Sequence, residues 1–95
     1  MATIDQLNET TPHVLIVDDD TRIRKLLRKY LADNGYRATT AADAREAYEK
    51  MVMLSFDLLV LDVMMPGLTG VEFTEKLRKE QNTVPILLLT ARADV

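Results

Sequence analysis

The sequence contains no cysteine among its 95 residues, which excludes a disulfide framework and a thiolate metal site. This absence is typical of cytoplasmic proteins, and we expect a cytoplasmic location. The apolar runs are also short, and none approaches the roughly 20 residues that a helix needs to cross a bilayer. The N-terminus lacks a basic segment followed by an apolar run, so we expect neither a secretory signal nor a membrane partner.

Charge of one sign is not in large excess. The net charge of −3 gives no reason to expect that this segment contacts nucleic acid directly. The length suffices for one modest domain, and a content of 47% hydrophobic and 28% charged residues is ordinary for a globular fold. The polar residues 1–12 predict a flexible N-terminal tail, and residues 13–95 predict the folded domain.

The stretch over residues 57–70 contains the most informative pattern. A short apolar run over 58–61 delivers one carboxylate, Asp62, and Pro66 and Gly67 then interrupt regular structure. A run of this length between such breaks predicts a strand buried on both faces. In open α/β sheets the ligand crevice lies outside the carboxyl ends of the strands. We therefore expect Asp62 to lie at a functional edge of a sheet.

Strand and helix patterns alternate along the rest of the chain. Predicted strands cover residues 14–17, 36–41, 58–61 and 86–89, and helices with a period of 3.6 residues lie between them. The apolar stripe of the first helix consists of Ile23, Leu26, Leu27, Tyr30 and Leu31, and that of the second of Ala44, Ala47, Tyr48, Met51 and Val52. The order βαβαβαβ predicts an α/β domain with a doubly wound parallel sheet.

Capping residues mark the predicted helix ends. Asp20 or Thr21 can cap the first helix and Asp43 the second, because their side chains accept hydrogen bonds from free N–H groups. Thr69 and the glutamate three residues later match a capping box for the third helix. Gly35 stands where a left-handed residue commonly ends a helix.

Polar side chains follow three of the predicted strands. The first strand ends in Asp18, Asp19 and Asp20, the third in Asp62 and the fourth in Thr90. Neighbouring strands lie about 4.8 Å apart, so these groups can share one site if the strands are adjacent. Carboxylates this close repel unless a cation intervenes, and oxygen ligands suit Mg²⁺. An Asp62 oxygen could then attack a phosphorus atom, and Thr90 could donate to a phosphoryl oxygen.

Three motifs at their joint spacing resemble the receiver domain of two-component response regulators. They are Val-Asp-Asp at 17–19, Leu-Asp-Val-Met-Met-Pro-Gly at 61–67 and Leu-Thr-Ala at 89–91. The resemblance runs from about residue 13 to residue 95. It implies a flavodoxin-like (CheY-like) fold with strand order 2-1-3-4. The sequence around Gly35 and over the Met-Met-Pro-Gly loop further resembles that of winged-helix (OmpR/PhoB-type) transcription regulators.

The resemblance implies a role for each site residue. Asp62 would be the phosphoacceptor for a sensor histidine kinase, which makes the domain a signalling module and not a turnover enzyme. Mg²⁺ would be bound by Asp19, Asp62 and the backbone carbonyl of Met64, with Asp18 acting through water. Thr90 would be the switch hydroxyl that moves towards the phosphoryl group. A downstream, DNA-binding output would be controlled by this switch.

The sequence departs from the family pattern after Thr90. The family continues with a helix, a strand that ends in a lysine, and a last helix, so we expect a receiver domain without its last helix-strand-helix. The fourth strand would then be an edge, which predicts a homodimer or a swapped assembly through that strand. A second interpretation is a non-signalling receiver fragment that serves as an interaction or dimerisation module.

Other readings of the same residues remain open at this point. A third interpretation is an Mg²⁺-dependent aspartyl-phosphate phosphatase, but such enzymes need an acid two residues after the nucleophile, where this chain has Met64. Asp20 can be a helix cap alone, and Thr90 can be a strand-favouring residue. The basic face of the first helix is either solvated or a docking surface; it comprises Arg22, Arg24, Lys25, Arg28 and Lys29. We assign no role to His13.

Overall fold

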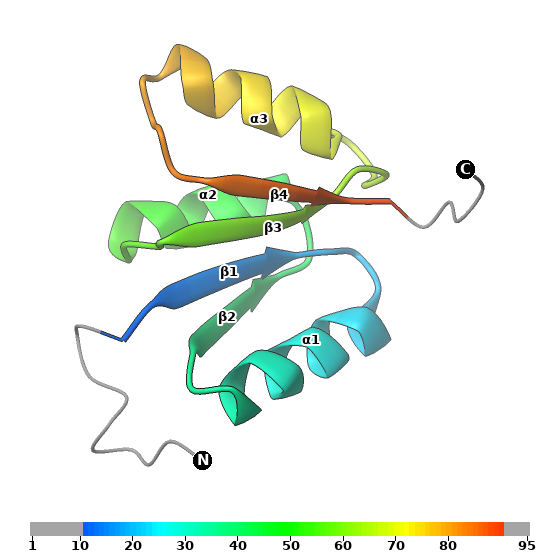
Figure 1. Cartoon of the computed structure of the whole chain (residues 1–95). Helices are drawn as coiled ribbons and strands as arrows, with labels where there is room; N and C mark the ends of the chain where they lie inside the picture. The colour runs from blue at the N-terminus through cyan, green and yellow to red at the C-terminus, as the bar shows by residue number, and fades with distance from the viewer. Residues whose placement is uncertain (1–10, 91–95) are drawn as a thin grey trace.

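The computed structural model describes residues 11–90 as a four-stranded sheet with three helices (Figure 1). The elements are β1 (His13–Val17), α1 (Thr21–Asp33), β2 (Arg37–Ala41), α2 (Ala44–Met53), β3 (Leu58–Asp62), α3 (Gly70–Lys79) and β4 (Ile86–Leu89). Every predicted element is present, with ends that differ by one or two residues. Most of the predicted tail, and Ala91 of the third motif, lie outside the described residues.

The sheet is parallel throughout and has the order β2-β1-β3-β4. Val17 pairs with Ala41 on one side and with Leu61 on the other, and Asp62 pairs with Leu89. The predicted doubly wound order is therefore confirmed. Because all strands run the same way, their carboxyl ends lie along one edge of the sheet.

Two apolar cores form because helices cover both faces of the sheet (Figure 1). β1 is buried along its whole length, and its alternate residues point into different cores. One core joins the sheet to α2 and α3 and includes Leu15, Val17, Leu59, Leu61, Ala44, Ala47, Phe73 and Leu77. The other joins it to α1 and includes Val14, Ile16 and Val60, with Leu27 and Leu31 packed against them.

The helix ends follow the predicted capping chemistry. Asp20 and Asp43 each accept a backbone N–H at 2.8 Å at the start of α1 and α2. Thr69 and Glu72 form the reciprocal capping box of α3, with distances of 3.1 and 3.0 Å. Gly35 has φ +89°, the left-handed conformation expected after α1.

Part of the predicted apolar stripes was wrong. Leu26 and Tyr30 of α1 are each 63% exposed, and Val52 of α2 is 75% exposed. A helix buries only the side chains above the strands that it contacts, and α1 packs against β2 and β1. In α2, Ala44, Ala47 and Met51 take the core side, which turns Val52 towards solvent.

No helix within residues 11–90 is long and apolar enough to cross a bilayer.

His13 is the one histidine of the chain, and it is buried at the end of the sheet opposite Asp62. Its Nε2 lies 2.6 Å from the Thr39 hydroxyl, and its ring centroid is 4.6 Å from that of Phe56. Burial lowers the pKa of the imidazole; the nearby Arg37 also lowers it, and Asp57 opposes this. The folded protein therefore prefers neutral His13.

The free energy of unfolding should consequently fall as pH is lowered below about 6.5, towards the lowered pKa of His13 in the folded protein. In this window the unfolded chain binds a proton at His13, whose ordinary pKa is 6.5, while the folded protein resists it. The stabilisation is present above pH 6.5 and is lost towards the lowered pKa of the folded state. Urea unfolding at several pH values measures this slope. His13→Gln should flatten it, and an unchanged slope in that variant would assign the effect to other groups.

Candidate functional site

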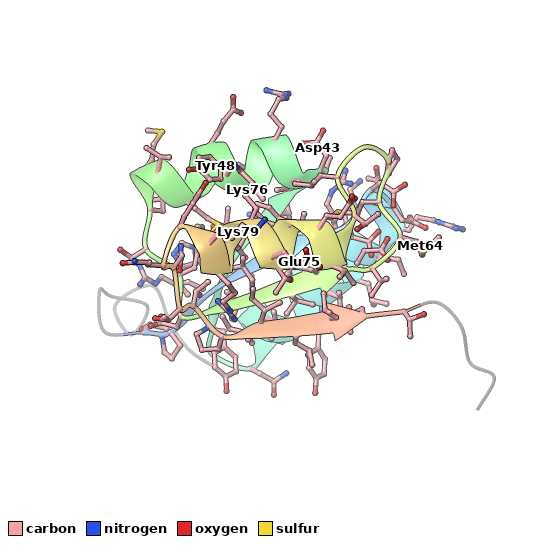
Figure 2. All side chains as sticks on the ribbon, turned by 90° about the horizontal axis from the view of Figure 1, so that it is seen from above. Asp43, Tyr48, Met64, Glu75, Lys76 and Lys79 are labelled. Atoms are coloured by element: carbon pink, nitrogen blue, oxygen red, sulfur yellow. The ribbon has the colours of Figure 1, made fainter. Side chains whose placement is uncertain are left out.

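The predicted site residues line one hollow of about 460 Å³ at the carboxyl edge of the sheet. Its lining consists of Asp18, Asp19, Asp20, Ile23, Asp62, Met64, Leu89 and Thr90. Three separate strands supply these groups, since β1 leads into the first acids, β3 ends at Asp62 and β4 leads into Thr90. Met64 lies at the end of the sheet to which the β4 arrow points (Figure 2).

Three of the acids form a compact cluster. Asp18, Asp19 and Asp62 each offer a carboxylate oxygen, and these oxygens all lie within 4.8 Å of one another. Asp18 is buried, Asp62 is half-buried and Asp19 is exposed, so the cluster is open to solvent on one side. An all-oxygen donor set with an exposed side fits a hard divalent ion that keeps some of its water, as Mg²⁺ does.

The environment of Asp18 disfavours its negative charge. Burial raises the pKa of its carboxyl group, the N–H of Asp20 at 2.8 Å lowers it, and the charges of Asp62 and Asp19 raise it further. The net effect is a raised pKa. A negative charge at Asp18 is therefore unfavourable in the folded protein unless a cation lies beside it.

Asp20 lines the hollow but acts as a helix cap. Its carboxylate accepts the N–H groups of Arg22 and Ile23, and the Arg22 hydrogen bond is the largest cause of its lowered pKa. This agrees with the reading of Asp20 as a cap. The pKa shifts of Asp18 and Asp20 thus have opposite signs although the residues are two positions apart, because burial is the largest cause at Asp18 and a hydrogen bond is the largest cause at Asp20.

The loop after β3 holds the Asp62 side chain through a backbone hydrogen bond. The N–H of Met64 donates to the Asp62 carboxylate at 3.1 Å, and the Met64 side chain is 71% exposed. The position of Met64 in the hollow therefore comes from its backbone, and its side chain points to solvent. Thr90 is exposed at the start of the segment that follows β4.

Gly70 is a supporting residue that the sequence reading missed. A Cβ at this position would lie 2.5 Å from the carbonyl oxygen of Asp62 and 3.1 Å from the Cα of Val63. The absent side chain allows the first turn of α3 to approach the end of β3, where the Gly70 N–H donates to the Val63 carbonyl at 3.1 Å. The signal in the sequence was a glycine directly after a helix cap, where a side chain is normally tolerated.

Arg24 was also missed as a neighbour of the acids. Its guanidinium donates to the backbone carbonyl of Asp18 at 2.7 Å and to the Thr21 hydroxyl at 3.1 Å. From the sequence we predicted only that Arg24 lies on a basic helix face. A contact between a helix side chain and the carbonyl of the preceding loop has no signature in the local sequence.

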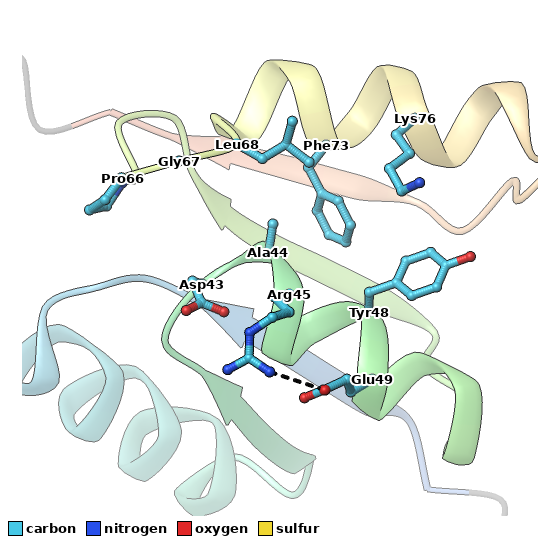
Figure 3. Close-up of a pocket in the computed structure, with 10 residues that line it drawn as sticks. All are labelled: Asp43, Ala44, Arg45, Tyr48, Glu49, Pro66, Gly67, Leu68, Phe73 and Lys76. Carbon is cyan, nitrogen blue, oxygen red and sulfur yellow. Dashed lines mark hydrogen bonds and ion pairs between the residues drawn. The ribbon is translucent and has the colours of Figure 1, made fainter.

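A larger hollow of about 510 Å³ lies between α2, α3 and the loop over 66–68 (Figure 3). Phe73 and Ala44 lie at its centre, and Arg45, Tyr48 and Lys76 lie around it. None of the predicted site residues lines it. Size alone therefore does not identify the site, and the acidic hollow is distinguished by its converging oxygen ligands.

The sequence pattern of the Response regulator receiver domain family matches residues 14–95. The chain belongs to this family. It is 51% identical over 88 residues to Protein PetR of Rhodobacter capsulatus, a match that covers 93% of this chain and 37% of PetR. It is 43% identical over 91 residues to Transcriptional regulatory protein ResD of Bacillus subtilis, covering 96% of this chain and 37% of ResD. The chain thus spans somewhat over a third of these relatives.

Solved receiver structures have the same fold. The chemotaxis protein CheY4 of Vibrio cholerae, crystallised at low pH, superposes with a TM-score of 0.83 at 40% identity, covering 90% of this chain and 72% of CheY4. TrrA of Thermotoga maritima, solved in complex with Mg²⁺-BeF, has a TM-score of 0.81 at 38% identity, covering 87% of this chain and 72% of TrrA. The chain is a receiver domain of the two-component type, whose members are generally phosphorylated on an aspartate and bind Mg²⁺ in an acidic pocket.

Substitutions of Asp18 and Asp20 in divalent-free buffer test the opposite pKa shifts of these two acids. Asp18→Asn should raise the melting temperature at pH 7, because it removes a charge that burial and two acids disfavour while keeping an oxygen acceptor. A raised pKa means that this stabilisation should disappear at low pH, where Asp18 is already protonated.

The matched control is Asp20→Asn, which should lower the melting temperature at pH 7, since it removes a charge that the N-terminus of α1 stabilises. Thermal unfolding followed by circular dichroism measures both. The same sign for the two variants would contradict this assignment. Added Mg²⁺ should stabilise the wild type more than Asp18→Asn.

Proposed function

We propose that this receiver domain accepts a phosphoryl group on Asp62 from a phosphohistidine of a sensor histidine kinase. The observation that supports this most is the convergence of Asp18, Asp19 and Asp62 on one open hollow that Thr90 also lines. The receiver domain would occupy residues 13–95, in agreement with the matched range of 14–95.

Each residue has a distinct part in the proposed transfer. A carboxylate oxygen of Asp62 attacks the phosphorus atom, an O–P bond forms, and the P–N bond to the kinase histidine breaks. The bonding electrons leave with the imidazole, and the product is an acyl phosphate on Asp62. The Met64 N–H at 3.1 Å holds one Asp62 oxygen during this step, and the Thr90 hydroxyl donates to a phosphoryl oxygen.

The ligands proposed for Mg²⁺ are Asp19, Asp62 and the backbone carbonyl of Met64, with Asp18 acting through water. When bound, the ion offsets the negative charge of the acids and of the transferred group. Asp18 would act through water, while its Oδ1 accepts the Asp20 N–H at 2.8 Å.

The proposed output is a conformational switch that regulates transcription. A phosphoryl group adds up to two negative charges beside the loop after β3, and Thr90 would move towards it. The relatives PetR and ResD extend well beyond the matched region, and ResD is described as a transcriptional regulatory protein. A winged-helix (OmpR/PhoB-type) output and a cytoplasmic location complete this proposal. This segment itself would make no nucleic-acid contact.

Signalling is favoured over turnover. An aspartyl-phosphate phosphatase needs a second acid two residues after the nucleophile, and Met64 occupies that position, with its side chain directed to solvent. Among the described residues that line the hollow, the other carboxylates all follow β1. We therefore propose that the chain is not an enzyme that turns over phosphoesters.

Replacement of the acceptor tests the proposal. Asp62→Asn should abolish labelling of the protein by a cognate kinase or by acetyl phosphate, because an amide oxygen does not form the acyl phosphate. Phosphate-affinity gels and intact mass measure the label. Asp57→Asn is the matched control, since Asp57 is an exposed acid at the opposite end of β3, and it should be labelled like the wild type. A label that persists in Asp62→Asn would place the acceptor elsewhere.

Self-association through β4 is a second candidate function. β4 is an edge of the described sheet, and its Leu87 and Leu88 are 52% and 40% exposed. An exposed apolar edge strand readily pairs with a strand of another molecule. We therefore propose a homodimer or a swapped assembly of the 95-residue chain through this edge.

Light scattering of the 95-residue chain tests this assembly. The chain should have the mass of a dimer or larger at micromolar concentration, and Leu87→Lys should shift it towards monomer because a charge on the edge disfavours pairing. The exposed Leu26→Lys on α1 controls for a general gain in solubility and should leave the mass unchanged. A clean wild-type monomer would argue against this function.

A further inference from the structure

The cations of α1 divide into two groups by their partners. Arg22 lies 3.6 Å from the Asp20 carboxylate, and Lys29 lies 2.7 Å from the Asp33 carboxylate. Acids of the helix and of its cap thus neutralise these two cations. Arg24, Lys25 and Arg28 have no such ion pair in the described part of the chain.

These three cations surround a small hollow between α1 and the end of β2, which lie side by side (Figure 1). Its lining consists of Thr21, Arg24, Lys25, Arg28 and Thr40, and its volume is about 170 Å³. Thr40 shares a sheet face with Ala38, which packs on the α1 side. No described carboxylate lines the hollow, and sites for drug-sized ligands are larger, roughly 300–1,000 Å³.

Hydrogen bonds hold part of this hollow in place. Arg24 is fixed by the Asp18 carbonyl at 2.7 Å and by the Thr21 hydroxyl at 3.1 Å. The nearby Glu46 does not form an ion pair with Arg24, because its carboxylate has other partners. Its pKa is lowered mainly by the Ala42 N–H and only to a small extent by Arg24. Its carboxylate accepts from Ala42 at 2.7 Å and pairs with Lys50 at 3.1 Å.

The arrangement is unfavourable without a counter-anion. Arg24 and Arg28 are four residues apart and Lys25 and Arg28 are three apart, spacings at which like charges on a helix repel. No hydrogen bond or ion pair within residues 11–90 involves the side chains of Lys25, Arg28 or Thr40. Two cationic groups and a hydroxyl are thus available to one ligand.

We propose that this hollow binds a phosphate-type oxyanion, either free inorganic phosphate or a phosphate monoester. Arg28 and Lys25 donate charge-assisted hydrogen bonds to its oxygens, and the hydroxyls of Thr40 and Thr21 can donate to the remaining ones. The guanidinium of Arg24 supplies a fixed positive charge on the inner wall. This oxyanion site is separate from the acid cluster, which repels anions.

The test is a ¹H–¹⁵N NMR titration of the protein with inorganic phosphate. The buffer contains no divalent ions, and added chloride holds the ionic strength constant. The amide signals of residues 21–28 and of Thr40 should shift and saturate. A parallel titration with glycerol 3-phosphate distinguishes a monoester from free phosphate by which binds more tightly. Arg28→Gln combined with Lys25→Gln should weaken phosphate affinity by about tenfold or more, since hydrogen bonds to charged groups contribute on that order.

The matched control removes the same charge from the two cations of α1 that form ion pairs. Arg22→Gln combined with Lys29→Gln should leave the phosphate affinity within about twofold of the wild type. Shifts that stay linear in phosphate, or an equal loss in both double variants, would show general ionic screening and would overturn the proposal. Tight binding of duplex DNA without saturable phosphate binding would also overturn it, by making the face a polyanion surface.

Discussion

Mutual repulsion among Asp18, Asp19 and Asp62 is the constraint on which the rest of the structure depends. Three carboxylate oxygens within 4.8 Å of one another would separate if their supports were flexible. They do not separate because β1 is buried along its length and pairs with both β2 and β3. The apolar cores on the two faces of the sheet thus hold charges together that water would otherwise keep apart.

The loops around the cluster add a second level of support. Gly70 lets α3 start against the carbonyl of Asp62, and the capping box of Thr69 fixes where that helix begins. The loop between them therefore has little freedom at its ends. A loop anchored in this way can transmit a change at Asp62 to the surface of α3.

Local patterns predicted most of the fold and the residues that line the candidate site. Short apolar runs identified β1, β3 and β4, and the alternation with helices identified the parallel sheet, which brings strand ends to one edge. Periodicity could not predict that Leu26, Tyr30 and Val52 are exposed, because it shows that a helix has an apolar side without showing which strands lie beneath it. The contacts of Arg24 with Asp18 and of Gly70 with Asp62 join different elements and leave no local signature.

Arg24 joins two regions of opposite charge. Its guanidinium donates to the backbone carbonyl of Asp18 and also forms the inner wall of the basic hollow beside β2. A ligand that shifts the position of this side chain would therefore act on the segment that presents the acids. If the proposed cation and oxyanion sites are coupled through this side chain, thermodynamic reciprocity requires that each ligand change the affinity of the other by the same factor.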